Sequence, residues 1–545
     1  MRRGLVLVVL AVLTLGASPR TTARLDLPRG YWGETETQPI LDKTLELRLA
    51  PDLSGLSAGE RLAVDRLISA GHIMNHLYEL ANHHQAPAAQ RALATHARSR
   101  PSAQPLADLY WLFSGPIATT LDNERLPFLP VDSLVPGKNV YPWGVTKEEI
   151  EEHLRAHPED RAAILNPRTV VRRAHVPELR GDLAALRKHS ILRVFHPGLE
   201  PGLRARLSRP AANGFYAVPY AVAYADSLVR AYHLLFEAAD LLESHDAELA
   251  GYFRHRARDL LANDYEAGDA AWVSGTFGRL NAQVGAYETY DDELFGTKAF
   301  HSMSILLEDE RKSAELLAAI KNLQEFENSL PYAPHKKVRD RVSIGIYDVI
   351  ADFGQARGTN TASILPNEAA IVRRYGRTIL MRQNILMHPD LLANARDTWE
   401  AAVVPQHRAD LQDDGSFYRV LWHEIGHYLG PDRDRRGRDL EIALQEESGT
   451  LEEMKADLVS LFLARSLRAS GYYDERKLKG VYASGVGRVL LKSRPRRDQV
   501  YGVMQLMQLN WYLDKGSVAF DPATKKLRIR YDRYHDSVAS LLREV

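Results

Sequence analysis

The sequence predicts a mainly helical α+β protein with two lobes and a wide cleft between them. Its 545 residues exceed what one hydrophobic core usually serves, which favours two or more lobes. Hydrophobic residues make up 45% of the chain and 70 basic residues balance 70 acidic ones, which excludes an intrinsically disordered chain. Helical periodicity covers more of the sequence than strand-like alternation does. We therefore expect a mixed lobe interrupted by a helical one.

The predicted elements follow one another in a simple order. Residues 60–95 and 217–266 are rich in Ala and Leu at helical spacing, which predicts long helices that face a core. Two shorter runs, 342–350 and 377–387, have the apolar and alternating character of strands. From residue 389 the helical pattern resumes and continues almost to Leu513.

The N-terminus has the order of a secretory signal. Arg2 and Arg3 precede an apolar run at 5–15 and then small and polar residues, which predicts a signal peptide over residues 1–23 and an exported, periplasmic or extracellular protein. The apolar run is too short for a membrane span, and a tail anchor or buried strand is the weaker alternative. Removing Arg2, Arg3 and Arg20 leaves 67 basic against 70 acidic residues. We expect no nucleic-acid partner and no stable membrane insertion after the signal is removed.

One pentapeptide has the spacing of a metal site. The chain lacks cysteine, so a metal must bind to His, Asp or Glu. His423 and His427 belong to the run H-E-I-G-H within a predicted helix at 417–429, and a turn of about 100° per residue brings both imidazoles to one face. Glu424 lies beside them. This pattern suits a zinc ion with a carboxylate that takes a proton from water, and the alternative is a chance pentapeptide with ordinary hydrogen bonds.

A catalytic zinc needs a third protein ligand, and the run E-E-M-K-A-D at 452–457 follows on the next predicted helix. Glu453 and Asp457 are an i, i+4 pair, so one can bind the metal while the other orients a ligand histidine. Thr450 and Glu453 also match a capping box, in which the carboxylate of Glu453 would only cap the helix that begins near Thr450. From its own segment alone, Glu453 fits both roles equally well.

Four segments together resemble the dipeptidyl peptidase III family of zinc metallopeptidases, in a bacterial, exported form with a five-residue histidine motif. H-E-I-G-H and E-E-M-K-A-D resemble the paired zinc motifs of that family. The run Y-E-T-Y-D-D-E-L-F-G at 287–296 resembles its E-(S/T)-Y-x-D-x-x-G element, and G-T-N at 358–360 with L-P-N at 365–367 resembles its G-x-N…P-N substrate segment. These segments cover about residues 215–516 in the order of the family.

The resemblance implies a role for eight residues. By position it implies one Zn²⁺ per chain held by His423, His427 and Glu453, with Glu424 as general base, Glu452 and Asp457 behind the ligand histidines, and Asn360 and Asn367 lining the substrate cleft. Without the family, turn chemistry beside Gly and Pro is the simpler interpretation of the two asparagines.

The resemblance also implies an architecture and an activity. A helical catalytic lobe at 299–337 and 396–515 would carry the zinc, and a mixed lobe at 24–298, 338–395 and about 516–545 would face it. The substrate would be a short peptide, from which the enzyme releases N-terminal dipeptides.

Two departures from the family bear on specificity. The family has a further histidine in the region of Tyr501, where this chain has none between His427 and His535. Tyr501 could donate a hydrogen bond there, although a core tyrosine is the simpler expectation. The family's Glu-x-Tyr element corresponds here to Asn281 and Gln283, without an acid. The alternatives are therefore an exported zinc hydrolase of other amide or peptide specificity and an inactive peptide-binding relative.

A rival motif favours a structural role. The run G-L-S-A-G at 55–59 matches the G-x-S-x-G pattern of serine hydrolases, but no strand leads directly into it. Ser57 and Glu60 instead match a capping box for the helix that follows.

Overall fold

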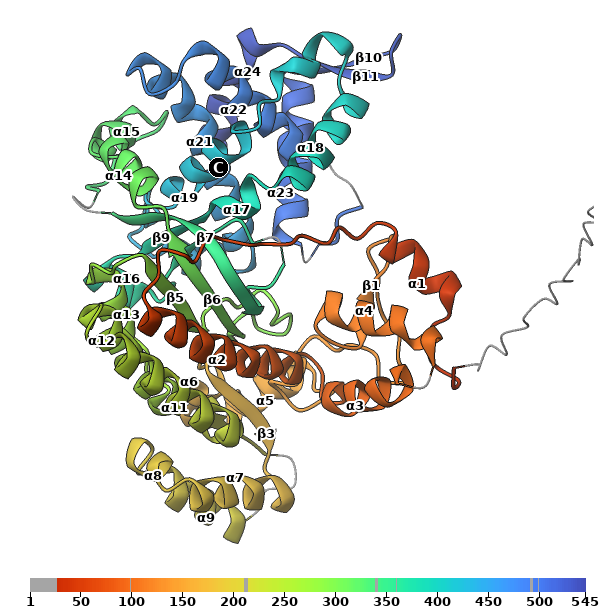
Figure 1. Cartoon of the computed structure of the whole chain (residues 1–545), viewed down its shortest axis with the longest axis vertical. Coiled ribbons are helices and arrows are strands. Elements are labelled where there is room, and N and C mark those ends of the chain that lie inside the picture. Colours follow the sequence, from red (N-terminus) through yellow and green to blue (C-terminus); the bar gives the residue numbers. More distant parts are fainter. Residues whose placement is uncertain are drawn as a thin grey trace, which may run out of the picture.

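The structure is a computed structural model that describes residues 27–545, except 99, 210–213, 339–341, 359, 491–493 and 498. The signal peptide predicted for residues 1–23 lies outside the described residues. Most of the described elements are helices, and they surround a central sheet (Figure 1). This arrangement confirms the mainly helical α+β class.

The central sheet has five strands in the order β5-β6-β7-β9-β8, and β7 and β9 form its parallel pair. Its strands are β5 (Leu280–Ala286), β6 (His301–Glu308), β7 (Ser343–Gly354), β8 (Ala362–Leu365) and β9 (Thr378–Arg382). The strand predicted at 342–350 is confirmed as β7. The strand predicted at 377–387 is too long, because the chain turns after Arg382 into the short helix α17 (Gln383–Leu386).

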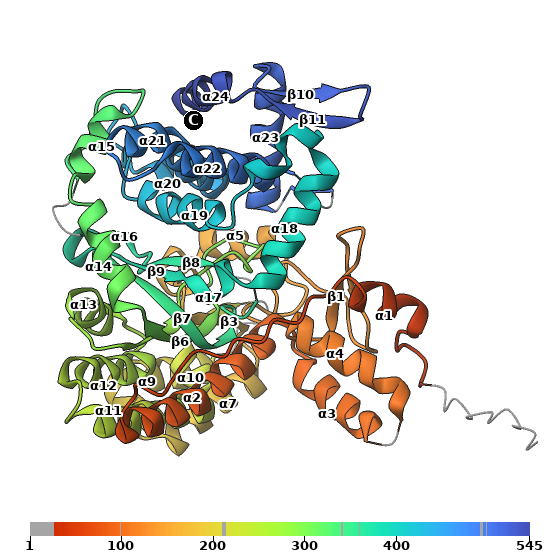
Figure 2. The ribbon, with the colours of Figure 1, turned by 45° about the horizontal axis from the view of Figure 1, so that its top comes forward.

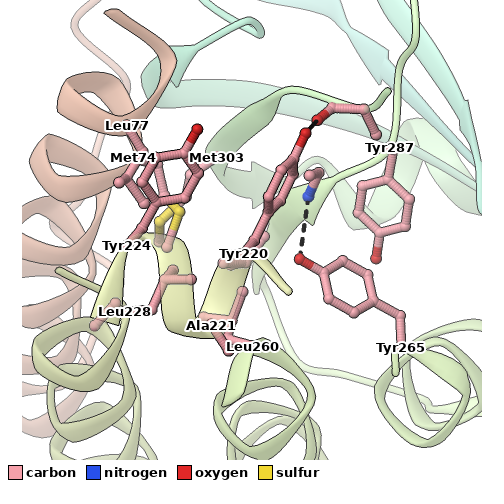
Figure 3. Packing of buried hydrophobic residues seen from close by; sticks show 14 of the residues in the cluster. Met74, Leu77, Tyr220, Ala221, Tyr224, Leu228, Leu260, Tyr265, Tyr287 and Met303 are labelled. Atoms are coloured by element: carbon pink, nitrogen blue, oxygen red, sulfur yellow. Dashed lines mark hydrogen bonds between the residues drawn. The ribbon is translucent and has the colours of Figure 1, made fainter. Parts of the chain in front are cut away.

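Long helices cover one face of this sheet. The helix prediction at 60–95 is confirmed with one break, between α2 (Ala58–Asn82) and α3 (Ala86–Ala97). The prediction at 217–266 is wrong at its start, because residues 217–219 end the strand β4 (Phe215–Pro219). From residue 220 it is confirmed as three helices, α10 (Tyr220–Ala223), α11 (Ala225–Leu242) and α12 (Ala247–Ala262). Figure 3 shows residues of this core, including Met74 of α2, Leu228 of α11 and Met303 of β6. Ser57 caps α2 by accepting a hydrogen bond from Glu60 N at 3.2 Å, which confirms its structural role.

A second group of helices lies above the other side of the sheet in Figure 1 and has its own apolar core. Its elements are α14 (Glu310–Ala319), α15 (Leu323–Ser329), α18 (Pro389–Ala402), α19 (Gly415–Gly426), α20 (Leu440–Leu444), α21 (Ser448–Ala469), α22 (Glu475–Arg488), α23 (Val500–Asp514), β10 (Val518–Asp521), β11 (Lys526–Ile529) and α24 (Tyr531–Glu544). The predicted helical pattern from 389 to about 513 is confirmed. The domain boundaries and the cleft stay predictions.

A small N-terminal unit has a third core and lies to one side of the molecule (Figure 2). It consists of α1 (Glu34–Leu41), α3, α4 (Gln104–Phe113), β1 (Ile117–Thr119) and β2 (Arg125–Pro127). The remaining elements are α5 (Lys147–Ala156), α6 (Arg161–Ile164), β3 (Thr169–Arg173), α7 (Val176–Lys188), α8 (Ile191–Phe195), α9 (Leu199–Ser208), α13 (Glu266–Ser274) and α16 (Ala369–Tyr375). Over the described ranges, no helix is both long enough and apolar enough to span a bilayer.

His301 on β6 is a buried histidine that should make the fold sensitive to acid. Its ring packs against Tyr220 and Tyr224, with ring centroids 5.2 and 5.8 Å away, and neither ring nitrogen has a hydrogen-bond partner among the described residues. Burial, with a smaller effect from the charge of Arg168, lowers the pKa of His301 from 6.5 to about 3. In this pH interval the unfolded chain binds a proton that the folded chain does not. The free energy of unfolding therefore falls as the pH drops below about 6.5.

We expect His301→Gln to reduce this acid sensitivity. Between pH 7 and pH 5 the histidine should cost the folded protein about 2 kcal/mol, because only the unfolded chain gains the proton. Urea denaturation of the wild type and the variant at both pH values measures the effect. The loss of stability on acidification should be smaller in the variant by about that amount, and equal losses would contradict the prediction.

Candidate metal centre

The two histidines lie at the C-terminal end of α19. The helix ends at Gly426, so the predicted end at Leu429 was wrong by three residues, and His427 is the C-cap residue. Because His427 keeps right-handed helical backbone angles (φ −66°, ψ −21°), its side chain still lies beside that of His423. The two imidazole rings are perpendicular, with their centroids 4.9 Å apart. The H-E-x-x-H spacing thus brings both rings to one face, as predicted from helix geometry.

Glu453 projects from α21 towards these histidines. The helix begins at Ser448 with Glu447 as its N-cap, so Thr450 is a buried residue within the first turn and not a cap. The capping-box interpretation of Thr450 and Glu453 is therefore wrong. Its failure leaves the carboxylate of Glu453 available to the histidines.

Two contacts hold α19 against α21. Gly426 lies so close to Ala456 that a Cβ atom built on it would be 2.9 Å from the Ala456 carbonyl oxygen. Lys455 Nζ donates to the carbonyl oxygens of Gly426 and Leu429 at 3.0 and 2.8 Å, and lies 2.9 Å from Glu452 Oε1. The lysine therefore caps the end of the histidine helix, where a positive charge is favourable.

Three potential ligand atoms converge between the helices. One atom each from His423, His427 and Glu453 forms a group within 4.8 Å of one another. Glu453 Oε2 lies 3.1 Å from His423 Nε2 and 4.0 Å from His427 Nε2, yet it is buried and has no hydrogen-bond geometry with a described residue. A buried carboxylate oxygen without a partner is costly unless something else binds it. Two imidazole nitrogens and one carboxylate are a donor set that zinc accepts, so these residues fit the implied metal.

Carboxylates behind the histidines fix the orientation of both rings. His423 Nδ1 is 2.8 Å from Asp457 Oδ1, and His427 Nδ1 is 2.9 Å from Glu452 Oε1, which directs both Nε2 atoms towards Glu453. Burial by itself would raise the pKa of Asp457 and Glu452, but cationic neighbours outweigh it and hold both pKa values below their usual range. Both carboxylates thus lie directly behind the imidazole rings.

Glu424 is buried beside the ligand group. Burial raises the pKa of its carboxyl group and the charge of Glu453 adds to this, while His423 and His427 oppose it. Arg382 approaches from β9, where it is fully buried and donates to Ser363 Oγ and Ser304 Oγ at 2.6 and 2.9 Å. A carboxyl group with a raised pKa can act as a general base and then as a general acid near neutral pH.

A second carboxylate near the site was not assigned a role from the sequence. Asn367 Nδ2 donates to Glu288 Oε2 at 3.0 Å. This hydrogen bond joins the L-P-N run at 365–367 to the run at 287–296, two of the segments on which the family resemblance depends. Burial, together with the charges of Glu453 and Glu424, raises the pKa of Glu288 to about 7 despite that hydrogen bond. Asn360 lies half-buried just before β8, and its role stays a prediction.

Two tyrosines expose their side chains near the same carboxylates. Tyr501, at the start of α23, is 42% exposed, so the expectation of a core tyrosine was wrong. The charge of Glu288 and local desolvation keep the pKa of Tyr290 well above its usual value. Local desolvation, followed by the charges of Glu453 and Glu424, does the same for the pKa of Tyr501. Both hydroxyl groups therefore stay protonated and can donate hydrogen bonds.

The fold has structural parallels that extend over nearly the whole chain. No protein-family profile matches the chain. A dipeptidyl peptidase III structure from Corallococcus sp. strain EGB has a TM-score of 0.79 and 26% identity, covering 94% of this chain and 89% of that one. The DPP III structure from Caldithrix abyssi has a TM-score of 0.76 and 25% identity, covering 93% of this chain and 90% of that one.

A curated relative matches over a shorter region. Nudix hydrolase 3 of Arabidopsis thaliana is 27% identical over 344 residues, which is 62% of this chain. The chain spans less than half of that relative's length, since the match takes in 44% of it.

Fold and site together define an α+β protein in which an H-E-x-x-H helix and a glutamate helix bring together a metal-ligand group. The structural parallels extend over nearly the whole chain and not only over these helices. These two structural parallels support the resemblance to the dipeptidyl peptidase III family.

Proposed function

We propose that the protein is an exported, zinc-dependent peptidase that removes dipeptides from the free amino terminus of short peptides. The observation that carries the proposal is the convergence of His423, His427 and Glu453 on one point between two helices, with Glu424 buried beside them. The likeness to two dipeptidyl peptidase III structures supports the peptidase class.

The three ligand residues would hold one zinc ion per chain. Zinc, when bound, acts as a Lewis acid that polarises a carbonyl group and eases the deprotonation of water. Asp457 and Glu452 keep the Nδ1 atoms of both histidines occupied, so that only the Nε2 atoms are directed towards the ion.

Glu424 would transfer the proton in this reaction. A carboxylate oxygen of Glu424 takes a proton from the attacking water and delivers it to the nitrogen of the leaving amine. Its raised pKa makes the first transfer easier and leaves the protonated form able to act as an acid in the second.

Glu288 and Asn367 would bind the amino terminus of the substrate. The hydrogen bond from Asn367 fixes the Glu288 carboxylate, and an ammonium group is the natural partner for a carboxylate in a half-buried position. Asn281 and Gln283 do not serve this purpose, because both are buried on β5, where Asn281 accepts a hydrogen bond from Trp272 Nε1 at 2.9 Å. Glu288 thus provides a carboxylate near the site, whereas the part of β5 that corresponds to the family's Glu-x-Tyr element has none.

The test is cleavage of a peptide pool by the zinc-loaded protein, read by mass spectrometry. We expect products that lack two residues from the amino terminus, and we expect peptides of identical sequence with an acetylated amino terminus to resist cleavage. Cleavage at other positions would favour a hydrolase of other peptide specificity. Binding of peptides without any cleavage would favour an inactive peptide-binding relative.

A further inference from the structure

The hairpin of β1 and β2 contacts two segments that both lead to the candidate site. Residues of its turn and second strand reach the segment 494–499, of which the structure describes all but residue 498, on one side and the loop 287–296 on the other. The first segment precedes Tyr501, and the second contains Glu288 and Tyr290. The hairpin belongs to the small N-terminal unit, seen beside the rest of the molecule in Figures 1 and 2.

Asn123 makes the contact with the segment ahead of α23. Its Nδ2 donates to Gln499 Oε1 at 2.7 Å and to the carbonyl oxygen of Arg494 at 3.0 Å. Its Oδ1 accepts from Arg496 Nη1 at 3.1 Å and from Gln499 Nε2 at 3.3 Å, and Arg496 Nη1 also donates to the Asn123 carbonyl oxygen at 3.0 Å. The side chain is 7% exposed. Every donor and acceptor of the Asn123 amide group is therefore used, and its partners lie far away in the sequence. Such a set of hydrogen bonds specifies one position for the segment relative to the hairpin.

Arg125 makes the contact with the other segment. Its guanidinium group forms a two-pronged ion pair with Glu293, in which the Nη2 to Oε2 distance is 2.7 Å. The same loop is held by Asp291, which accepts from Tyr78 Oη at 3.1 Å and from Gln355 Nε2 at 2.8 Å. A two-pronged arginine–carboxylate pair fixes orientation as well as distance. The loop directly after Tyr290 is therefore anchored at two points.

The segment 494–499 in turn fixes the start of α23. Pro495 packs so closely on Gly502 that a Cβ atom built on the glycine would lie 2.9 Å from Pro495 Cβ. The Tyr501 ring lies 5.2 Å from the guanidinium group of Arg488, whose Nε is 3.8 Å from Asp457 Oδ2. Asp457 is the residue that orients His423. A shift of the segment would therefore move Tyr501 relative to the metal ligands.

We propose that the β1–β2 hairpin ties the loop of Glu288 and Tyr290 to the start of α23, so that Asn123 is a positioning residue for peptide binding. The proposal rests on the proposed peptidase function, because it assumes that the peptide lies between these two segments. The contacts fix the spacing of the two tyrosines without touching the metal ligands. A site that is already assembled binds a flexible peptide at a lower entropic cost.

The variant Asn123→Gly tests the tie directly. Asn123 has φ +64°, which glycine adopts without strain, so the substitution removes the four side-chain hydrogen bonds and keeps the turn. We expect amide hydrogen exchange to rise at least tenfold in 494–503 while the melting temperature and zinc stoichiometry stay unchanged. Arg497→Ala, on an exposed residue of the same segment, should leave the exchange unchanged. Unchanged exchange in Asn123→Gly would overturn the proposal.

Peptide affinity tests the consequence for function. Zinc-loaded protein carrying Glu424→Gln should bind the pentapeptide AAFAA, and adding Asn123→Gly should weaken that binding about tenfold. Gln499→Ala removes a partner of Asn123, so the effects of Asn123→Gly and Gln499→Ala on affinity should not add when the two are combined. Increased exchange with unchanged affinity would overturn the positioning role. If the parent protein binds no peptide, the proposed function fails, whereas the exchange experiment still decides whether the tie exists.

Discussion

Glu424→Gln should keep stoichiometric zinc and lower kcat for peptide hydrolysis by about 10³-fold or more. The amide has the shape of the carboxylate but cannot accept a proton from water, so only the transfer step is removed. Glu424 contributes no atom to the group of three candidate ligands, so its replacement leaves that group complete. Metal analysis and initial rates on the same preparation measure the two effects together.

A matched control is Glu452→Gln, which makes the same chemical change on the glutamate helix. Glu452 orients His427 through Nδ1, so its loss should weaken zinc binding about 10-fold to 100-fold, with much of the rate restored at saturating zinc. The two variants thus separate proton transfer from metal binding. Full activity in zinc-loaded Glu424→Gln would contradict the assignment of the base.

The grouping of the two candidate histidine ligands could be predicted because local geometry determines it. His423 and His427 are four residues apart on one helix, and this spacing alone brings the rings together. The role of Glu453 does not follow from its own segment, because Thr450 and Glu453 also match a capping box, which the fold does not form. The true helix start at Ser448 depends on the loop before it, which the capping pattern does not describe.

The residues across from the ligands could not be predicted in the same way. Glu288 follows β5 and Asn367 follows β8, and their hydrogen bond depends on the order of strands in the sheet. β5 and β6 were not predicted at all. The sequence of β5, L-N-A-Q-V-G-A, does alternate apolar with polar or small residues, but β5 is buried throughout and β6 is buried except at its last residue, so their polar residues do not mark a solvent-facing side. The position of Tyr501 likewise depends on how α23 packs against α21.

Gly426→Ala should move apart the two helices that carry the candidate ligands, with a large effect on zinc affinity. The added methyl group would lie 2.9 Å from the carbonyl oxygen and 3.0 Å from the Cα of Ala456. Both are backbone atoms, so no side-chain rotation relieves the contact and α19 must move away from α21. Because Glu453 lies on α21, we expect zinc affinity to fall at least tenfold and the free energy of unfolding to fall by about 1–3 kcal/mol.

Helix propensity opposes this effect, and a control measures its size. Alanine is more favourable than glycine within a helix by about 1 kcal/mol, but Gly426 is the last residue of α19, where that gain is smallest. Gly181→Ala in α7 adds a methyl group with no atom within 4 Å, so it should raise the free energy of unfolding by up to about 1 kcal/mol and leave zinc affinity unchanged. Zinc titration and denaturation of both variants decide between the two effects. If Gly426→Ala behaves like Gly181→Ala, the close approach of the helices does not set the metal site.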